Sequence, residues 1–159
     1  MNRSPVALRQ ASFPAACFGL VPSDTPQAGT FEAIFAALDA NSSPLIGPAA
    51  PRLLVIAIRD AEGAVTGGLW ACTSFEWLHV EMLFVPASLR GLGVGSALIA
   101  TAEAEARNRG CRGAYLDAFS FQAAGFYRRL GFAQFGVIDD FPPGHQRLYF
   151  RKLFKAAAF

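Results

Sequence analysis

Apolar residues form continuous runs in some parts of the chain and recur at helical spacing in others, which predicts a mixed α/β fold. The run Leu53–Ile58 has strand length and is apolar throughout, so we expect a central strand buried on both faces. Residues 65–73 form a second expected strand, whose Gly67-Gly68 pair indicates a bulge or a close approach of two backbones. Residues 77–85 form a third. Short turns separate the three strands, so they should form an antiparallel meander.

A first helix is predicted near the amino terminus, because apolar residues recur there at helical spacing. Thr30 is a suitable N-cap, and Asn41-Ser42-Ser43-Pro44 is expected to end the helix. The helix is amphipathic and should pack on another element through a stripe formed by Phe31, Ile34, Phe35 and Leu38. Residues 17–21 could form one short strand before it.

A second helix is predicted after a glycine-rich loop. It should run to about Arg109, where Gly110 ends it. Two acid–base pairs with a spacing of four residues, Glu103 with Arg107 and Glu105 with Arg109, are typical of a solvated helix face. The buried stripe is expected to consist of Leu98, Ile99, Ala102 and Ala106.

The rest of the chain is predicted to complete a mixed sheet. Residues 112–117 form a strand that should be parallel to 77–85, because a helix connects the two in a βαβ unit. Ser120 can cap a third helix, and a hairpin follows with its last strand at 146–154. We therefore expect one domain over residues 1–159. Its class is α/β (α+β), with a mixed central sheet of six to seven strands, an antiparallel N-terminal meander, a βαβ unit and a C-terminal hairpin.

Composition and charge exclude several classes of protein. The 159 residues are 53% hydrophobic and 16% charged, which is typical of a chain with a large core and excludes general disorder. The formal net charge is +2 and the basic residues are scattered, so no nucleic-acid partner is expected. Arg9, Gln10 and Pro14 interrupt the apolar N-terminal stretch, and no other run reaches the roughly 18 residues of a membrane span. We expect a cytoplasmic protein with no membrane partner.

The cysteines give no sign of a disulfide framework or a metal site. Cys17, Cys72 and Cys111 are odd in number, lie far apart and lack the spacing of metal ligands. We expect reduced thiols in the core and no metal.

The glycine-rich stretch Arg90–Gly95 is the strongest candidate for a ligand site. A helix N-terminus carries free N–H groups and a partial positive charge, which suit a phosphate. The three alternating glycines would leave this approach clear and permit positive φ, and Arg90 adds a permanent cation. Other phosphate loops fit less well. A P-loop requires a lysine that is absent nearby, and the dinucleotide fingerprint requires glycine where Ser96 or Leu98 stands.

This Arg-x-x-Gly-x-Gly pattern follows Val85-Pro86 and precedes the stretch Gly125–Phe132. Together these motifs strongly resemble those of the GNAT family of N-acetyltransferases. The resemblance covers about residues 52–154 and implies acetyl-coenzyme A as cosubstrate. In proteins similar to this one, the strand at 81–85 splays from the strand at 112–117, and the pantetheine arm of the coenzyme enters the gap.

The resemblance also implies which residues bind the coenzyme. Backbone groups of Leu83, Phe84 and Val85 would hold the pantetheine arm. Ser120 stands where many relatives carry an asparagine that contacts the coenzyme. The pyrophosphate would lie against Arg90, Gly91, Leu92, Gly93, Val94, Gly95 and Ser96.

Acetyl transfer to an amine is helped by a general base. An amine with a pKa near 10.4 is mostly protonated at neutral pH, and freeing it costs about 4 kcal/mol. Glu81 and His79 lie two residues apart on one strand, hence on one face, and either could accept the proton, directly or through water. The resemblance ranks Glu81 above His79. A paired carboxylate and a satisfied histidine are the alternatives without a catalytic role.

Tyr127 is the candidate general acid. It matches the tyrosine that lies near the coenzyme sulfur in the family and can protonate the departing thiolate. The pKa values of a phenol and a thiol, about 10 and 8.5, are close enough for this transfer. The alternative is that Tyr127 is a core aromatic, which is the role expected for Phe126.

The acceptor is specified least. By resemblance its site would be built from residues 31–43 and 139–145. Asp139 and Asp140 could receive a cationic amine. Aromatic candidates, which could equally belong to the core, are Trp70, Phe75, Trp77, Phe141 and His145. We expect transfer of an acetyl group from acetyl-CoA to a primary amine of a small molecule or protein, by direct attack in a ternary complex.

Two further expectations complete this interpretation. The alternative function is a non-catalytic acyl-CoA-binding or sensing module, which would keep the loop and lose the chemistry. A homodimer is possible, because relatives often pair through sheet edges or final strands, and the aromatic strand at 148–150 could do so.

Overall fold

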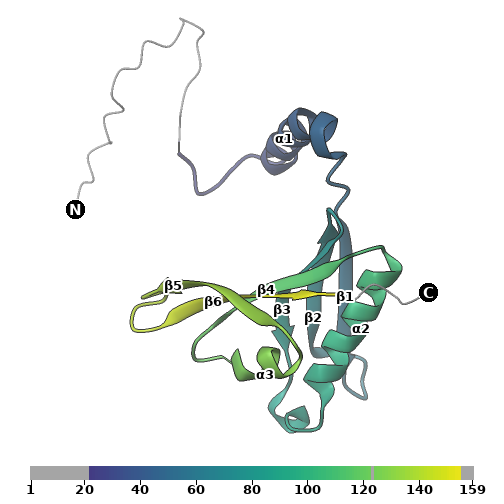
Figure 1. Ribbon diagram of the computed structural model, residues 1–159, viewed down its shortest axis with the longest axis vertical. Helices are drawn as coiled ribbons and strands as arrows, with labels where there is room; N and C mark the ends of the chain where they lie inside the picture. Colours follow the sequence, from purple (N-terminus) through teal and green to yellow (C-terminus); the bar gives the residue numbers. More distant parts are fainter. Residues whose placement is uncertain (1–21, 123, 155–159) are drawn as a thin grey trace, which may run out of the picture. The chain divides into compact units, whose positions relative to one another are not determined.

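Six strands form one mixed sheet in the computed structural model, which describes residues 22–122 and 124–154. The order across the sheet is β1-β2-β3-β4-β6-β5 (Figure 1). Only β3 and β4 run parallel, and all other neighbours are antiparallel. The predicted meander, βαβ unit and C-terminal hairpin are therefore confirmed. The strands are β1 (Arg52–Arg59), β2 (Val65–Ser74), β3 (Trp77–Phe84), β4 (Gly113–Phe119), β5 (Ala133–Asp139) and β6 (Gln146–Leu153).

The chain divides between Asn41 and Ser42 into two units, and the second contains the whole sheet. The first contributes residues 22–41 to the described part, including most of helix α1 (Thr30–Ile46). The strand suggested at 17–21 lies outside the described residues, and the single domain over 1–159 stays a prediction. Among the described helices, none is long and apolar enough to cross a membrane.

Helix α1 is longer than the sequence predicts. It continues through Asn41-Ser42-Ser43-Pro44 and ends at Ile46. A proline removes one N–H donor, and the helix tolerates this loss near its last turn. The residue that ends it is Gly47, which has a φ of +79° and donates a hydrogen bond to the Ser43 carbonyl.

Strand β1 occupies an edge of the described sheet, so the prediction of a central strand is wrong. Leu54 is buried, whereas Leu53 and Val55 are more than 40% exposed. An apolar run cannot distinguish a strand buried on two faces from one buried on a single face. The predicted close approach at the glycine pair is confirmed, because a Cβ on Gly68 would lie 2.2 Å from the Ile56 carbonyl oxygen.

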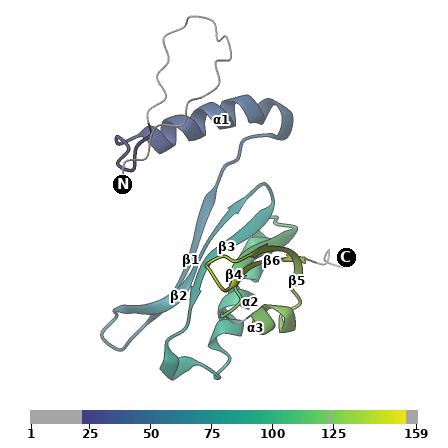
Figure 2. The same cartoon turned by 90° about the vertical axis from the view of Figure 1, so that its left-hand side faces the viewer.

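Helix α2 (Val94–Asn108) packs along one face of β1, β2 and β3 (Figure 2). Its predicted apolar stripe is confirmed, since all four residues are buried. Beneath it, the largest fully buried side chains come from β2, β3, β4 and β6 and are Leu69, Leu78, Leu116 and Phe150. Cys111 is also in this core, and burial raises the pKa of its thiol.

The charged side of α2 is only partly solvated: the side chains of Arg107 and Glu105 are 42% and 38% exposed, whereas Glu103 and Arg109 depart from the sequence prediction. The Glu103 side chain is 10% exposed and accepts two hydrogen bonds from Lys152 Nζ on β6, at 2.7 and 2.8 Å. Arg109 pairs with Glu105 as expected, at 2.7 Å, but its guanidinium also donates to the carbonyls of Arg52 and Leu53. These pairs connect α2 to the edge strand β1 and to β6. Helical spacing alone cannot reveal them, because their partners lie far away in the sequence.

Lys152→Met is expected to lower the free energy of unfolding by about 2 kcal/mol, measured by urea denaturation. The substitution leaves the Glu103 carboxylate buried with Arg107, 3.9 Å away, as a weaker ion-pair partner. Arg112→Met is the control, because Arg112 and Glu76 form an exposed pair. That variant should lose less than about 1 kcal/mol. Equal losses in the two variants would show that the buried pair has no special role.

Two predictions about the C-terminal half are also wrong. Helix α3 spans Ala124–Arg129, so Ser120 does not cap it. Instead the backbone N–H of Ser120 donates to the Gln146 carbonyl, and its hydroxyl accepts a hydrogen bond from the Gln146 N–H. Strand β6 lies between β4 and β5, so residues 148–150 offer no free edge, and the homodimer itself stays a prediction.

Candidate functional site

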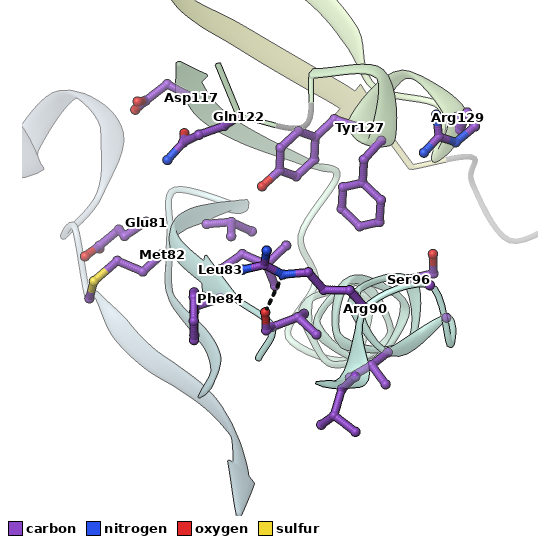
Figure 3. Close-up of a pocket in the computed structure, with 18 of the residues that line it drawn as sticks. Glu81, Met82, Leu83, Phe84, Arg90, Ser96, Asp117, Gln122, Tyr127 and Arg129 are labelled. Carbon is purple, nitrogen blue, oxygen red and sulfur yellow. Dashed lines mark hydrogen bonds between the residues drawn. The ribbon is translucent and has the colours of Figure 1, made fainter. Parts of the chain in front are cut away.

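The two parallel strands diverge and open a cavity in the middle of the sheet. Pairing of β3 with β4 runs from Trp77 opposite Gly113 to Val80 opposite Leu116 and then stops. Glu81 is the extra residue of a bulge, because its neighbours Val80 and Met82 pair with consecutive residues of β2. The bulge bends β3 away from β4. The cavity at this divergence has a volume of about 890 Å³ (Figure 3).

The glycine-rich loop forms one wall of the cavity. It follows a single turn of 3₁₀ helix, η1 (Ala87–Leu89), and leads into α2. Gly93 is the N-cap of α2 with a φ of +83°, and no side chain caps the first turn. A Cβ on Gly91 or Gly93 would meet nothing within 4 Å, so these glycines border open space. The first-turn N–H groups of α2 are therefore without a side-chain acceptor next to an open cavity.

Gly95 has a different role from the one that the sequence suggests. It is helical, and a Cβ there would lie 3.2 Å from the Phe126 ring. Its missing side chain makes room for Phe126 of α3 against the first turn of α2. Phe126 lines the cavity and also packs against the core, so the expectation that it is only a core aromatic is incomplete.

Opposite charges line the two sides of the cavity. Figure 3 shows Glu81, Met82, Asp117 and Gln122 on one side and Ser96 and Arg129 on the other. Arg90 lines it at the loop, where its Nε donates to the Val85 carbonyl at 3.1 Å. Arg129 has no hydrogen-bond or ion-pair partner within the described residues. Two arginines and a helix N-terminus are the donor set that a pyrophosphate or phosphate requires.

Tyr127 comes from α3, and its hydroxyl points into the cavity between these two sides (Figure 3). The ring is 8% exposed and packs near the rings of Phe126, Phe132 and Phe150. Burial raises the pKa of the Tyr127 phenol, and the Asp117 carboxylate raises it further. The phenol therefore stays protonated at neutral pH and is available as a proton donor.

The two carboxylates on the acidic side differ in their partners. Asp117 accepts two hydrogen bonds from Arg147, at 2.6 and 2.9 Å, so its charge is already paired. Within the described residues, no hydrogen bond engages Glu81. The nearest basic side chain is His79, whose Nδ1 lies 3.9 Å from Glu81 Oε1. His79 stacks on Tyr115 with ring centroids 4.4 Å apart and does not line the cavity. Glu81 is therefore the uncommitted carboxylate.

Most of the residues predicted from the sequence meet in this cavity. Exceptions are His79, Leu92, which is 71% exposed, and Ser120, whose hydroxyl bonds to the β6 backbone. Those that line it are Glu81, Leu83, Phe84, Val85, Arg90, Gly91, Gly93, Val94, Gly95, Ser96 and Tyr127.

Sequence reasoning missed several residues that line the same cavity. Arg129 carried a signal, because it lies in the stretch Gly125–Phe132, but nothing there distinguished it from Arg128. Asp117 carried a signal as the residue where the parallel strands were expected to part. The other cavity residues that the sequence did not predict carried no such signal, and they are Val80, Met82, Leu89, Phe121 and Gln122.

Comparison with known proteins identifies the family. The model of the Acetyltransferase (GNAT) family matches residues 21–132. The chain belongs to the GNAT family. The resemblance drawn from the loop and from the stretch Gly125–Phe132 is thereby confirmed. The match spans the diverging strands, the loop and the tyrosine, so the cavity described above is made of GNAT elements.

Individual relatives agree with the GNAT assignment. An acetyltransferase of Agrobacterium fabrum is 40% identical over 134 residues, which are 84% of this chain and 98% of the relative. A blasticidin-S acetyltransferase of Streptomyces morookaense is 48% identical over 83 residues, which are 52% of this chain and 61% of the relative. A crystal structure from Agrobacterium tumefaciens has a TM-score of 0.80 and 39% identity, and the match covers 86% of this chain and all of that one.

This GNAT protein is an acyl-CoA-dependent N-acetyltransferase, with acetyl-CoA as cosubstrate. The alternative of a non-catalytic sensing module is set aside. The residues present fit the coenzyme, because the cavity joins an uncapped helix N-terminus and two arginines to a strand edge freed by the bulge.

Proposed function

We propose that this enzyme transfers the acetyl group of acetyl-CoA to a primary amine by direct attack in a ternary complex. One observation carries the proposal. A single cavity holds a cationic phosphate-binding side, a protonated Tyr127 and the uncommitted carboxylate of Glu81. The bond between nitrogen and the acetyl carbon forms, the carbon–sulfur bond breaks, and the thiolate leaves.

A small-molecule amine is the acceptor that the relatives favour. The name of the Streptomyces relative gives its acceptor as blasticidin S, and that relative is 48% identical over 83 residues. We therefore place small molecules ahead of protein amines as acceptors.

Glu81 is proposed to accept the proton of the incoming ammonium group. Glu81 is the extra residue of the β3 bulge and lines the cavity, and its side chain is 40% exposed, so both the acceptor and water can reach it. His79, 3.9 Å away and 36% exposed, can pass that proton to solvent. Asp117 is excluded as the base, because Arg147 already neutralises it.

Tyr127 is proposed to protonate the thiolate as it leaves. Because the pKa of its phenol is raised, Tyr127 keeps its proton at neutral pH until the carbon–sulfur bond breaks and the thiolate forms. The raised pKa makes the Tyr127 phenol a weaker acid than the departing thiol, so its donation requires the short approach that a buried, fixed ring provides.

Arg129→Gln is expected to raise the KM for acetyl-CoA about tenfold and leave kcat unchanged, because it removes one charge-assisted contact to phosphate. Initial rates at saturating amine measure both constants, and calorimetry gives the Kd of coenzyme A directly. Arg128→Gln is the matched control, since Arg128 bonds to Gln134 and does not line the cavity. Equal KM values in the two variants would remove Arg129 from the coenzyme site.

Direct attack is expected because, within residues 22–122 and 124–154, no thiol lines the cavity to carry the acetyl group. Cys111 is buried in the core and Cys72 lies on β2, and neither reaches the cavity surface. Initial-rate plots with both substrates varied should therefore intersect. Parallel lines, with burst release of coenzyme A in the absence of amine, would indicate a covalent acetyl-enzyme instead.

The function is tested by combining binding with turnover. Calorimetry should show one molecule of acetyl-CoA bound per chain, and a thiol reagent should detect coenzyme A release that depends on added amine. A panel of small amines and a lysine-containing peptide distinguishes the two acceptor classes. Binding without amine-dependent release for any member of the panel would contradict the proposed transfer.

A further inference from the structure

Four aromatic side chains form a cluster, the aromatic wall, which reaches the cavity through Phe121. We define it as Phe119, the last residue of β4, and Phe121, in the turn after β4, with Phe141 and His145 from the turn between β5 and β6. Phe119 and Phe121 stack with centroids 5.3 Å apart and planes at 11°. His145 packs edge-on against Phe121, with ring centroids 4.9 Å apart. Phe141 packs edge-on against Phe119, with ring centroids 5.9 Å apart.

The wall is held rigidly from behind. The Arg147 guanidinium lies 5.8 Å from the Phe119 ring centroid and 5.5 Å from that of Phe141. Its nitrogens also donate two hydrogen bonds to the Asp117 carboxylate. Asp140 accepts a hydrogen bond from the Gly144 N–H at 2.7 Å, and Asp139 accepts one from the Gln146 side chain. These two aspartates therefore fix the turn that carries Phe141 and His145, and their carboxylates are already engaged.

Phe121 is the member of the wall that lines the cavity, and it is 59% exposed. Phe119 covers one face of its ring in parallel, and His145 meets it edge-on. A large apolar ring this exposed on a fixed support offers an apolar surface that a bound partner can cover. Stacked and edge-on geometry favours a planar partner over a branched or saturated one.

The same side of the cavity offers one anion for the other end of such a partner. The Glu81 carboxylate accepts no hydrogen bond from a described residue, whereas the Asp117 carboxylate is paired with Arg147. An ammonium group on this side of the cavity would therefore pair with Glu81. Met82, which is 60% exposed, lines the cavity next to Glu81 and gives a polarisable apolar surface.

We propose that the acceptor is a primary amine carried on a flat aromatic or heteroaromatic ring. Its ring stacks on Phe121 and its amine reaches Glu81. The proposal rests on the function proposed above and adds the chemical class of the acceptor. Phe121 is then a specificity-determining residue, and the wall behind it sets the orientation of the ring.

The test compares 2-phenylethylamine with 2-cyclohexylethylamine, which match in length and apolar character and differ in planarity. The wild-type enzyme should show about fivefold higher kcat/KM for the aromatic amine. Phe121→Leu should abolish this preference and leave the KM for acetyl-CoA unchanged. Phe135→Leu is the matched control, because Phe135 is 54% exposed, lies on β5 and does not line the cavity. That variant should keep the full preference.

Calorimetric titration of each amine into the enzyme saturated with coenzyme A gives a second readout that needs no turnover. The aromatic amine should bind about fivefold more tightly, and Phe121→Leu should remove the difference. Equal rates and equal affinities for the two amines, or the same loss in both variants, would overturn the ring proposal. Selective binding of the aromatic amine without acetylation of any amine would instead contradict the proposed function and leave the ring site standing.

Discussion

Replacing Tyr127 by phenylalanine should lower kcat about 100-fold, because the thiolate must then leave without a proton donor. The ring and its contacts with Phe126, Phe132 and Phe150 remain, so the fold and the KM for acetyl-CoA should not change. Steady-state rates with a saturating amine measure the loss. Tyr115→Phe is the control, because it removes a phenol that does not line the cavity.

The pH dependence gives an independent check on Tyr127. The protonated phenol is the active form, and its pKa is raised by burial and by Asp117. Wild-type activity should therefore persist to a pH above the ordinary tyrosine value and fall only when this phenol ionises. The Tyr127→Phe variant should lack that fall. An unchanged kcat, or an unchanged alkaline limb, would show that the thiolate leaves without help from Tyr127.

Glu81→Gln should lower kcat/KM for the amine about 100-fold at pH 7, because the variant has no carboxylate to take the ammonium proton. The defect should shrink as the pH approaches the pKa of the amine, near 10.4 for a lysine-like amine, since the free amine then forms without a base. A pH series of kcat/KM for both proteins measures this convergence. The KM for acetyl-CoA should stay the same.

Two further variants show whether a loss of kcat/KM in Glu81→Gln comes from loss of the general base. Glu76→Gln changes an exposed glutamate paired with Arg112, outside the cavity, and should have no effect on kcat/KM. His79→Gln should have a smaller effect than Glu81→Gln, because His79 only passes the proton onward. A larger loss at His79 than at Glu81 would make the histidine the base. A loss at Glu81 that does not shrink at high pH would indicate that the carboxylate positions the acceptor only.

Local pattern predicted the strands and the main helix well. The stripe of Leu98, Ile99, Ala102 and Ala106 is buried as periodicity requires, and the meander and βαβ unit have the predicted order. The failures concern information that a local pattern does not contain. The apolar run of β1 looks the same at an edge as in the centre, and the partner of Glu103 is Lys152, 49 residues away.

The coenzyme side of the site was more predictable than the acceptor side for the same reason. Arg90 and the glycines of the loop lie together in the sequence, so a single motif describes them. The acceptor side joins Glu81 on β3, Asp117 on β4 and Phe121 in the turn after β4, and only the splayed pairing of β3 with β4 brings them together. Ser120 misled the prediction, because a good N-cap residue bonded to β6 instead of to a helix.

The most direct test of the account is to follow the acetyl carbonyl carbon itself. Acetyl-CoA labelled with ¹³C at the carbonyl is mixed with enzyme and 2-phenylethylamine and observed by NMR. The account predicts that the thioester signal is replaced by an amide signal at a rate set by the enzyme, and that Tyr127→Phe slows this conversion about 100-fold. Conversion of the label to acetate at the same rate with and without amine would contradict it.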